Sequence, residues 1–192
     1  MYDFTILREE IKSSLPSKRY EHTIGVSYIS CALAMAHNEV IYKAQLAGLL
    51  HDCAKSYKGD ELIKLCIKHG IELSDSALAA PQVVHAIYGA YLAEHKYKIH
   101  DEDILNAVRY HTTGRSGMSQ LEKIVYIADY IEPLRNQVSN LNEIRALAFK
   151  DLDLCMYTIL KQTVDYLKNH TSSIDEDTIS ALLYYKEKAN DR

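Results

Sequence analysis

The sequence has little glycine and proline, and it lacks long hydrophobic runs. Only 7 Gly and 3 Pro occur in 192 residues. Long stretches rich in Ala, Leu, Ile, Lys and Glu are therefore free of helix breakers, and an all-α fold is predicted. No run of about 18 uncharged apolar residues occurs, and the N-terminus has no basic segment followed by an apolar one. We therefore expect neither a membrane span nor a secretory signal.

Closely spaced cysteines and a surplus of basic residues are also missing. The four cysteines, Cys31, Cys53, Cys66 and Cys155, form no C-x-x-C motif and lie in apolar helical stretches, which favours a reduced, cytoplasmic compartment. The formal net charge is -4 and no Lys/Arg run stands out, so we expect neither nucleic acid nor a membrane surface as a partner. The 15 tyrosines are compatible with a homodimer, although packing within one chain explains them as easily.

Helical periodicity divides the chain into segments. The length predicts one compact domain over residues 1–192, with a core of about 17–135 and C-terminal helices over 141–190 packing on it. The small residues Ala44, Ala47 and Gly48 predict that a neighbouring backbone comes close. Asp60 is expected to cap a helix, and 71–81 and 112–117 are expected to be loops. The predicted helices are 3–15, 17–37, 40–55, 60–69, 82–97, 101–111, 119–131, 143–169 and 175–188.

Six polar side chains fall on the inward faces of these helices. Each one alone is more often a hydrogen-bonded core residue. Burying all of them would cost several kcal/mol each without compensation, and a shared divalent cation is the simplest partner that offsets this cost. The set contains no cysteine, and mixed imidazole and carboxylate ligands suit Fe, Mn, Zn or Co. The set consists of His22, His51, Asp52, His85, His111 and Asp129.

His51 and Asp52 are adjacent, and this restricts how they bind metal. Neighbouring residues on a helix diverge by about 100°. The two side chains can therefore meet one ion only at a helix end, while the second oxygen of Asp52 could bind another ion. Because six ligands are more than one catalytic ion usually takes from protein, the sequence is compatible with one ion or two.

Groups suited to phosphate surround this set in the sequence. Lys55 lies one turn after His51, Arg115 lies in the Thr-Thr-Gly loop, and Arg135 follows the Asp129 helix. The same loop offers other groups that can donate hydrogen bonds to phosphate oxygens. They are the hydroxyls of Thr112 and Thr113 and the backbone amides that the glycines leave accessible. Each cation alone is equally typical of a solvated surface. A metal together with these groups indicates a phosphate ester or anhydride as the ligand.

Five ordered strings carry a resemblance to a known family. They are RYEHTIGV at 19–26, HDCAK at 51–55, HAIYGA at 85–90, HTTGR at 111–115 and ADYIEPLR at 128–135. Together they resemble the HD-domain metal-dependent phosphohydrolases. Within that family they are similar to the YqeK-type symmetrical bis(5'-nucleosyl)-tetraphosphatases. The resemblance covers nearly the whole chain, but the third beyond Arg135 carries no equally specific motif, so it assigns no adenosine-binding residues there.

The resemblance implies an iron-binding helical domain, with Mn, Co or Zn as alternatives, that splits diadenosine tetraphosphate into two ADP. It implies His22, His51, Asp52 and Asp129 as metal ligands. It also implies that His85 and His111 either hold a second ion together with Asp52 or touch phosphate. Asp52, His85 and His111 are thus the candidate catalytic residues. The candidate substrate-binding residues are Lys55, His85, His111, Thr112, Thr113, Arg115 and Arg135.

Other activities fit the same pattern. HD domains include nucleotidases and dNTP triphosphohydrolases, and the metal could also be structural in a non-catalytic protein that only senses a nucleotide. A ferritin-like di-iron bundle needs Glu-x-x-His pairs, and the sequence contains none. We therefore expect a metal-dependent hydrolase whose water attacks an inner phosphate of a dinucleoside polyphosphate.

Overall fold

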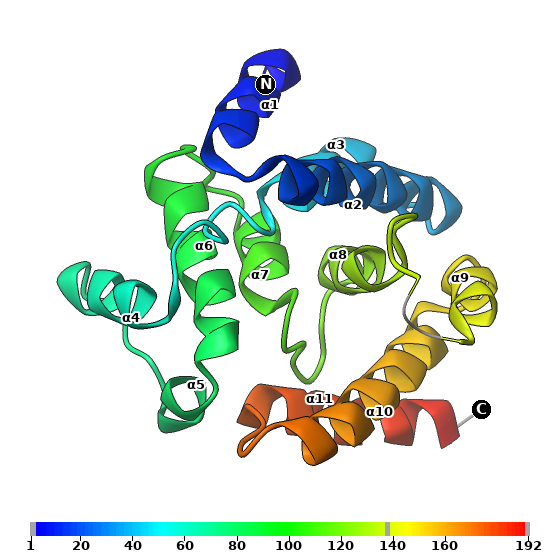
Figure 1. Cartoon of the computed structure of the whole chain (residues 1–192). Coiled ribbons are helices and arrows are strands. Elements are labelled where there is room, and N and C mark those ends of the chain that lie inside the picture. Colours follow the sequence, from blue (N-terminus) through cyan, green and yellow to red (C-terminus); the bar gives the residue numbers. More distant parts are fainter. Residues whose placement is uncertain (1–2, 137–138, 191–192) are drawn as a thin grey trace.

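The computed structural model describes residues 3–136 and 139–190. These residues form eleven α-helices, one short 3-10 helix and no strand (Figure 1), which confirms the predicted all-α class. The helices are α1 (Phe4–Ser14), α2 (Ser17–Ala36), α3 (Ile41–Leu50), α4 (Gly59–Lys68), α5 (Asp75–Ala79), η1 (Pro81–Val83), α6 (Val84–His95), α7 (Glu102–Tyr110), α8 (Gln120–Ile131), α9 (Leu141–Ala148), α10 (Leu152–His170) and α11 (Glu176–Asn190).

The main core lies where α2, α3, α7 and α8 pack together. Helices α2 and α3 run side by side across the top of Figure 1. Gly48 permits this packing, because a Cβ at this position would lie 2.8 Å from the Cα of Ser27 on α2. The close backbone approach predicted from the small residues of α3 is therefore confirmed. Apolar side chains such as Val26, Leu49 and Ile124 are fully buried between these helices.

The remaining helices flank this core. Helix α6 packs on α7 and carries α4 on its other side, where a second, smaller apolar cluster lies. Helices α10 and α11 cross the lower part of Figure 1, and α10 packs against α8 and α9. The grouping of 17–135 as a core and 141–190 as packing helices stays a prediction. Among the described residues, no helix is long and apolar enough to cross a membrane.

Several predicted boundaries are wrong. The helix expected over 40–55 ends at Leu50. The loop expected over 71–81 contains α5, which Ser74 caps by accepting a hydrogen bond from the Ala77 amide. The helix expected over 143–169 is two helices, because the chain turns after Ala148 and Asp151 caps α10. The N-cap residue of α4 is Lys58 and not Asp60. Asp60 lies in the first turn of the helix, where its negative charge interacts favourably with the helix dipole.

Candidate active site

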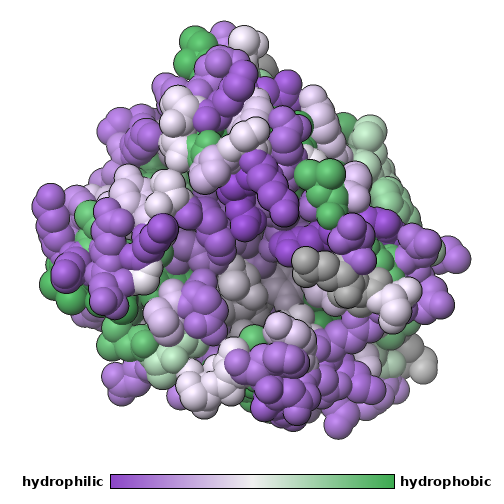
Figure 2. Space-filling model, in the orientation of Figure 1, coloured by the Kyte–Doolittle hydropathy of each residue, from purple (hydrophilic) through white to green (hydrophobic). Residues whose placement is uncertain are grey.

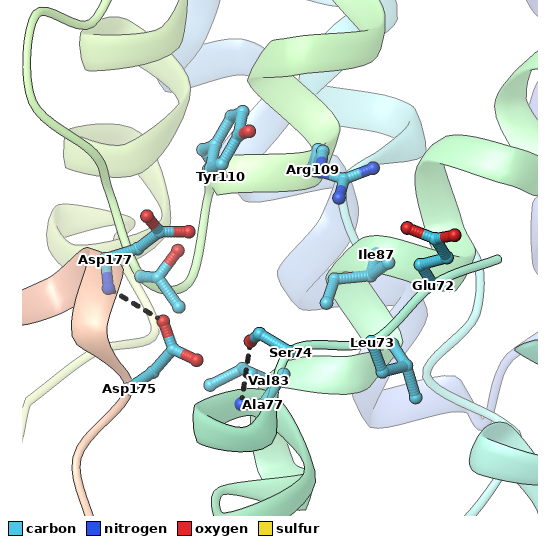
Figure 3. Close-up of a pocket in the computed structure, with 11 residues that line it drawn as sticks. Glu72, Leu73, Ser74, Ala77, Val83, Ile87, Arg109, Tyr110, Asp175 and Asp177 are labelled. Atoms are coloured by element: carbon cyan, nitrogen blue, oxygen red, sulfur yellow. Dashed lines mark hydrogen bonds between the residues drawn. The ribbon is translucent and has the colours of Figure 1, made fainter.

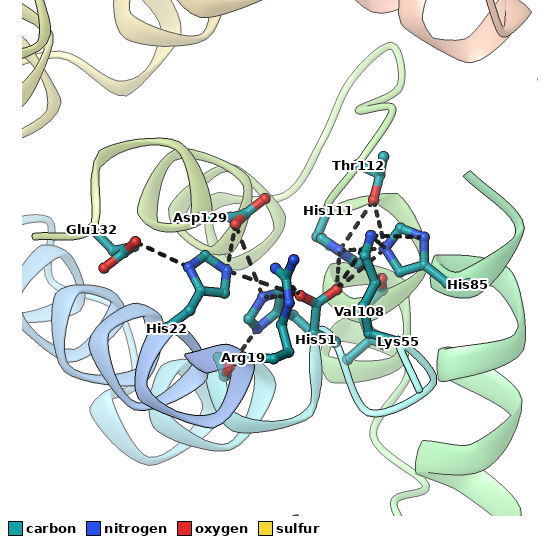
Figure 4. A network of polar contacts seen from close by, with 12 residues as sticks. Arg19, His22, His51, Lys55, His85, Val108, His111, Thr112, Asp129 and Glu132 are labelled. Carbon is teal, nitrogen blue, oxygen red and sulfur yellow. Dashed lines mark hydrogen bonds and ion pairs between the residues drawn. The ribbon is translucent and has the colours of Figure 1, made fainter. Parts of the chain in front are cut away.

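The structure brings the six inward polar side chains together where α2, α3, α6, α7 and α8 meet (Figure 4). We call them the His/Asp cluster. Five of them are buried, and the Asp129 side chain is 23% exposed, so one edge of the cluster faces solvent. The His/Asp cluster consists of His22, His51, Asp52, His85, His111 and Asp129.

The end of α3 explains how His51 and Asp52 share one centre. The helix stops at Leu50, and the following residues form tight turns in which the Cys53 amide donates to the Leu50 carbonyl and the Lys55 amide to the Asp52 carbonyl. The backbone therefore no longer follows the 100° step of a regular helix. Nε2 of His51 lies 3.5 Å from Oδ2 of Asp52, so the two side chains point to the same centre.

Hydrogen bonds to the outer ring nitrogens orient all four imidazoles. In each ring Nδ1–H donates outward, which leaves Nε2 facing the centre as a lone-pair donor, the tautomer that binds metals. The Nδ1 acceptors are Glu132 Oε1 for His22 at 3.0 Å, and the carbonyls of Gly48, Gln82 and Val108 for His51, His85 and His111, each at 2.7 Å.

The arrangement of the ligand atoms fits a divalent metal. The buried Nε2 atoms of His22 and His51 make no hydrogen bond with any described residue, although Oδ1 of Asp129 lies 3.0 Å from Nε2 of His22. Two groups of three ligands have all their donor atoms within 4.8 Å of one another. They are His22, His51 and Asp129 in one group, and His51, Asp52 and His111 in the other. A buried centre of histidines and aspartates of this kind suggests divalent metal binding.

The two oxygens of Asp52 face different histidines. Oδ2 lies 3.5 Å from Nε2 of His51 and 3.9 Å from Nε2 of His22. Oδ1 lies 3.3 Å from Nε2 of His85 and 3.6 Å from Nε2 of His111. One carboxylate therefore faces both halves of the His/Asp cluster.

The electrostatics of the cluster favour bound cations. Burial tends to raise the pKa of Asp52, but the charge of His51 and the hydrogen bonds of the surrounding histidines hold it well below its usual range. The pKa of Asp129 is also depressed, because His22 and the charges of His51 and Arg135 outweigh burial. Both carboxylates are thus anionic at neutral pH. Burial, together with the charges of Lys55 and His111, lowers the pKa of His85 to about 4, so this imidazole is neutral there.

Three cationic side chains stand beside the two carboxylates. A guanidinium nitrogen of Arg19 lies 2.9 Å from Asp52 Oδ2, and one of Arg135 lies 2.9 Å from Asp129 Oδ1. Nζ of Lys55 lies 2.9 Å from Nε2 of His85, and burial lowers the pKa of this lysine. All three cations line one cavity of about 690 Å³, which we call the cationic cavity. Figure 2 shows hydrophilic side chains around the hollow at the centre of this face.

The Thr-Thr-Gly loop contributes one residue to the cluster. Thr112 Oγ1 lies 3.1 Å from Nε2 of His111 and 3.3 Å from Nε2 of His85. The structure does not bring Thr113 and Arg115 there. Arg115 makes a bidentate pair with buried Glu122, at 2.8 and 3.0 Å, and the same carboxylate forms the capping box of α8.

Thr113 lines a separate cavity of about 390 Å³, and its hydroxyl donates to the Gly114 carbonyl. Figure 3 shows this cavity with Arg109 and three carboxylates, which belong to Glu72, Asp175 and Asp177. We call it the acidic cavity. Its carboxylates repel the phosphates that Thr113 was expected to bind.

The sequence interpretation assigned no role to Arg19 or Glu132, which both contact the cluster. Glu132 is 1% exposed, accepts from His22 and also accepts from the Leu134 amide at 2.7 Å. Gly25 makes room for it, since a Cβ there would lie 2.9 Å from Glu132 Oε2. Arg145 of α9 fixes this segment by donating to the carbonyls of residues 131, 132 and 135. Both missed residues lie within the strings that carry the resemblance, and that position is the only signal the sequence offers.

Comparison with known proteins places this site in a family. The HD domain pattern matches residues 19–134. The chain is 38% identical over 178 residues to a Staphylococcus aureus protein named bis(5'-nucleosyl)-tetraphosphatase, symmetrical, covering 91% of this chain and 90% of the relative. It is 37% identical over 170 residues to the Bacillus subtilis protein of the same name, covering 88% and 89%. A crystal structure from Clostridium acetobutylicum, described as a predicted HD superfamily hydrolase involved in NAD metabolism, superposes with a TM-score of 0.93 at 37% identity over 98% of this chain and 99% of that one.

Proposed function

Because the chain belongs to the HD domain family, we propose that it is a metal-dependent hydrolase that cleaves diadenosine tetraphosphate symmetrically into two ADP. One observation carries the proposal. The chain matches symmetrical tetraphosphatases over about nine-tenths of its length, and every histidine and aspartate of the His/Asp cluster is present and oriented inward.

The metal ligands are His22, His51, Asp52 and Asp129, with Asp52, His85 and His111 at a second ion. Asp52 would contribute to both positions, because its two oxygens face different histidines. A divalent ion at each position would stabilise negative charge on phosphoryl oxygens and lower the pKa of a bound water. We propose iron, with Mn, Co or Zn as alternatives.

The tautomer of His85 and His111 favours one of their two expected roles. Nδ1–H of each ring donates to a backbone carbonyl, and the pKa of His85 is lowered to about 4. Nε2 of His85 therefore has a lone pair and no proton at neutral pH. In the protein without substrate it can bind metal or accept a hydrogen bond from Lys55, at 2.9 Å, and it has no proton to donate to phosphate. We assign His85 and His111 to the second metal position.

The cationic cavity binds the polyphosphate. Arg19, Lys55 and Arg135 line it and reach the ligand carboxylates, so phosphates bound there lie against the His/Asp cluster. Thr112 offers a hydroxyl to a phosphate oxygen from the other side. The roles of Thr113 and Arg115 as substrate-binding residues stay predictions.

The cleavage step follows from the position of these cations. Water attacks one inner phosphorus and gives up a proton to the solvent as a new P–O bond forms, and the bridging P–O bond to the other inner phosphate breaks with its electron pair going to the leaving ADP. Lys55 and Arg135 neutralise the charge that develops on that oxygen. Asp52 would hold the metal and orient the water.

One experiment tests the activity. The protein is purified without oxygen, its metal content is measured, and the same sample is incubated with diadenosine tetraphosphate. We expect ADP as the only nucleotide product and loss of turnover after metal removal, with recovery when metal is restored. Formation of AMP and ATP, or inertness toward the dinucleotide with turnover of a nucleoside monophosphate or dNTP, would contradict the proposal and favour another HD-type activity. Binding without multiple turnover would favour the sensor. The homodimer and the cytoplasmic location stay predictions.

A further inference from the structure

A cavity of about 570 Å³ lies between α8 and α10, next to the His/Asp cluster. Its wall includes Asp129 and Tyr130 from α8, Arg135 from the segment that follows, and Gln162, Thr163 and Tyr166 from α10. We call it the tyrosine cavity. Its volume is within the range of small-molecule sites, about 300–1,000 Å³.

We propose that the tyrosine cavity binds one nucleoside of the substrate, with the base stacked on Tyr166 and hydrogen-bonded by Gln162. This inference rests on the proposed function for the identity of the substrate. It assigns nucleoside-binding residues to the C-terminal helices, where the sequence offered no motif.

Tyr166 is suited to stacking. Tyr166 is 60% exposed, so its ring is accessible to a ligand. The ring of His170, one turn later, stacks on one face with centroids 4.0 Å apart and planes 13° apart. That contact holds the tyrosine ring in place and leaves its opposite face for a base. Bases stack on aromatic side chains without regard to sequence, because every base has a π-face.

Gln162 supplies hydrogen-bond donors next to this ring. It precedes Tyr166 by four residues, so both side chains lie on the same face of α10. The Tyr130 hydroxyl donates to Gln162 Oε1 at 3.1 Å, and an amide whose oxygen is engaged still has two N–H donors. A purine presents ring nitrogens and, in guanine, a carbonyl oxygen that accept such bonds. The cavity therefore offers a stacking surface and an edge contact from one helix.

Arg135 connects the tyrosine cavity to the phosphate site. It lines both the tyrosine cavity and the cationic cavity, and it contacts Asp129 at 2.9 Å. A nucleoside beside Tyr166 thus lies next to Arg135 and to Asp129 of the His/Asp cluster, so its phosphates can reach both the cationic cavity and the cluster.

The two other cavities described above fit a nucleoside less well. The cationic cavity has no Tyr or Phe in its described wall and is lined by Lys18, Arg19, Lys55 and Arg135, which suits phosphates. The acidic cavity presents three carboxylates that repel a nucleotide. The tyrosine cavity has one carboxylate in its described wall, that of the metal ligand Asp129.

Ligands with and without a base test the assignment. The binding of ADP and of pyrophosphate to the metal-loaded protein is measured by calorimetry for wild type, Tyr166→Ala, Tyr166→Phe and Gln162→Leu. Tyr28→Ala is the matched control, because Tyr28 is 53% exposed on α2 and packs on Arg8. We expect Tyr166→Ala to weaken ADP binding about 5- to 150-fold, the range given by base stacking on an aromatic ring. Gln162→Leu should weaken it about 2- to 10-fold.

Pyrophosphate binding should stay unchanged in every variant, and Tyr166→Phe and Tyr28→Ala should bind ADP as wild type does. Wild-type ADP affinity in Tyr166→Ala, or an equal loss for ADP and pyrophosphate, would overturn the assignment. Failure of the proposed function is seen separately, as absence of diadenosine tetraphosphate hydrolysis by wild type. The comparison of ADP with pyrophosphate still decides whether the cavity binds a nucleoside in that case.

Discussion

Replacing Asp52 by alanine should remove metal binding from both halves of the His/Asp cluster while the protein stays folded. The reason lies in the two carboxylate oxygens. Oδ2 is 3.5 Å from Nε2 of His51, and Oδ1 is 3.3 Å from Nε2 of His85. If Asp52 bridges two ions, its loss takes a ligand from each. Asp129 belongs to one of the two ligand groups, so Asp129→Ala should weaken one ion only.

The expected change in Tm follows from the stabilisation that a bound metal ion gives to the folded state. A ligand that binds only the folded state at 100 times its Kd stabilises it by about 2.7 kcal/mol. For a chain of this size each kcal/mol shifts Tm by about 2–4 °C. Adding Fe(II) or Mn(II) without oxygen should therefore raise the wild-type Tm by about 5–11 °C for each ion bound at that saturation. The Tm of Asp52→Ala should not respond to metal, and its activity should be abolished.

Thermal unfolding with and without metal measures this shift, and elemental analysis counts the bound ions. Asp60→Ala is the matched control, because Asp60 is an exposed aspartate in the first turn of α4, and it should keep the wild-type shift. We expect two ions in wild type, one in Asp129→Ala and none held tightly in Asp52→Ala. A wild-type Tm shift in Asp52→Ala, or turnover by this variant after metal removal, would refute the bridging role.

Three further predictions test the substrate site and the fold. Arg135→Ala should mainly raise KM for diadenosine tetraphosphate, about ten-fold, with a smaller fall in kcat because the leaving oxygen loses one of its two neutralising cations. Steady-state kinetics measure this, with Arg109→Ala in the acidic cavity as the control; a fall in kcat at constant KM would contradict it. Gly48→Ala should cost about 1–3 kcal/mol in unfolding free energy, because its Cβ would lie 2.8 Å from the Ser27 Cα; an unchanged urea midpoint would refute the tight α2–α3 contact. Asp101→Ala should cost about 1 kcal/mol at pH 7, because Asp101 caps α7 and pairs with Lys43 at 2.8 Å. These contacts outweigh burial and lower the pKa of Asp101 in the folded protein below its ordinary value of 3.8. The ionised Asp101 therefore stabilises the fold above pH 3.8, and this stabilisation is lost as the pH falls through the lower pKa of the folded state. Urea unfolding at pH 7 and at pH 3 should show a smaller difference from wild type at pH 3, and a constant difference would contradict the assigned pairing.

Local signals in the sequence predicted much of the fold. The all-α class and the close approach at Gly48 depend on local composition or on side-chain volume, and both are confirmed. The break between α9 and α10 was missed, because the apolar spacing of 143–169 continues across it. Asp151, which caps α10, resembles any other surface aspartate in the sequence.

The candidate site was predictable to the extent that its residues are unusual in their local surroundings. A histidine or aspartate on an apolar helical face is unusual, and all six members of the His/Asp cluster were identified in this way. Arg19 and Glu132 are ordinary charges near helix ends, and only the fold reveals what they contact. Arg115 is the opposite case. The sequence suggested that this loop arginine contacts phosphate, but in the structure it pairs with Glu122, seven residues later.

The position of the ligands at helix ends has a physical cause. The last four carbonyls of a helix have no partner within it. Gly48 and Val108 lie in the last turns of α3 and α7, and their carbonyls accept Nδ1–H from His51 and His111, each three residues later. A histidine just after a helix thus satisfies an open carbonyl through Nδ1–H and fixes its own tautomer with Nε2 facing the centre of the cluster. The same contact inside a helix would compete with the backbone amide four residues on. A buried histidine at the first position after an apolar helix is therefore prepared by local backbone geometry to bind metal, which is why His51 and His111 stand where α3 and α7 stop.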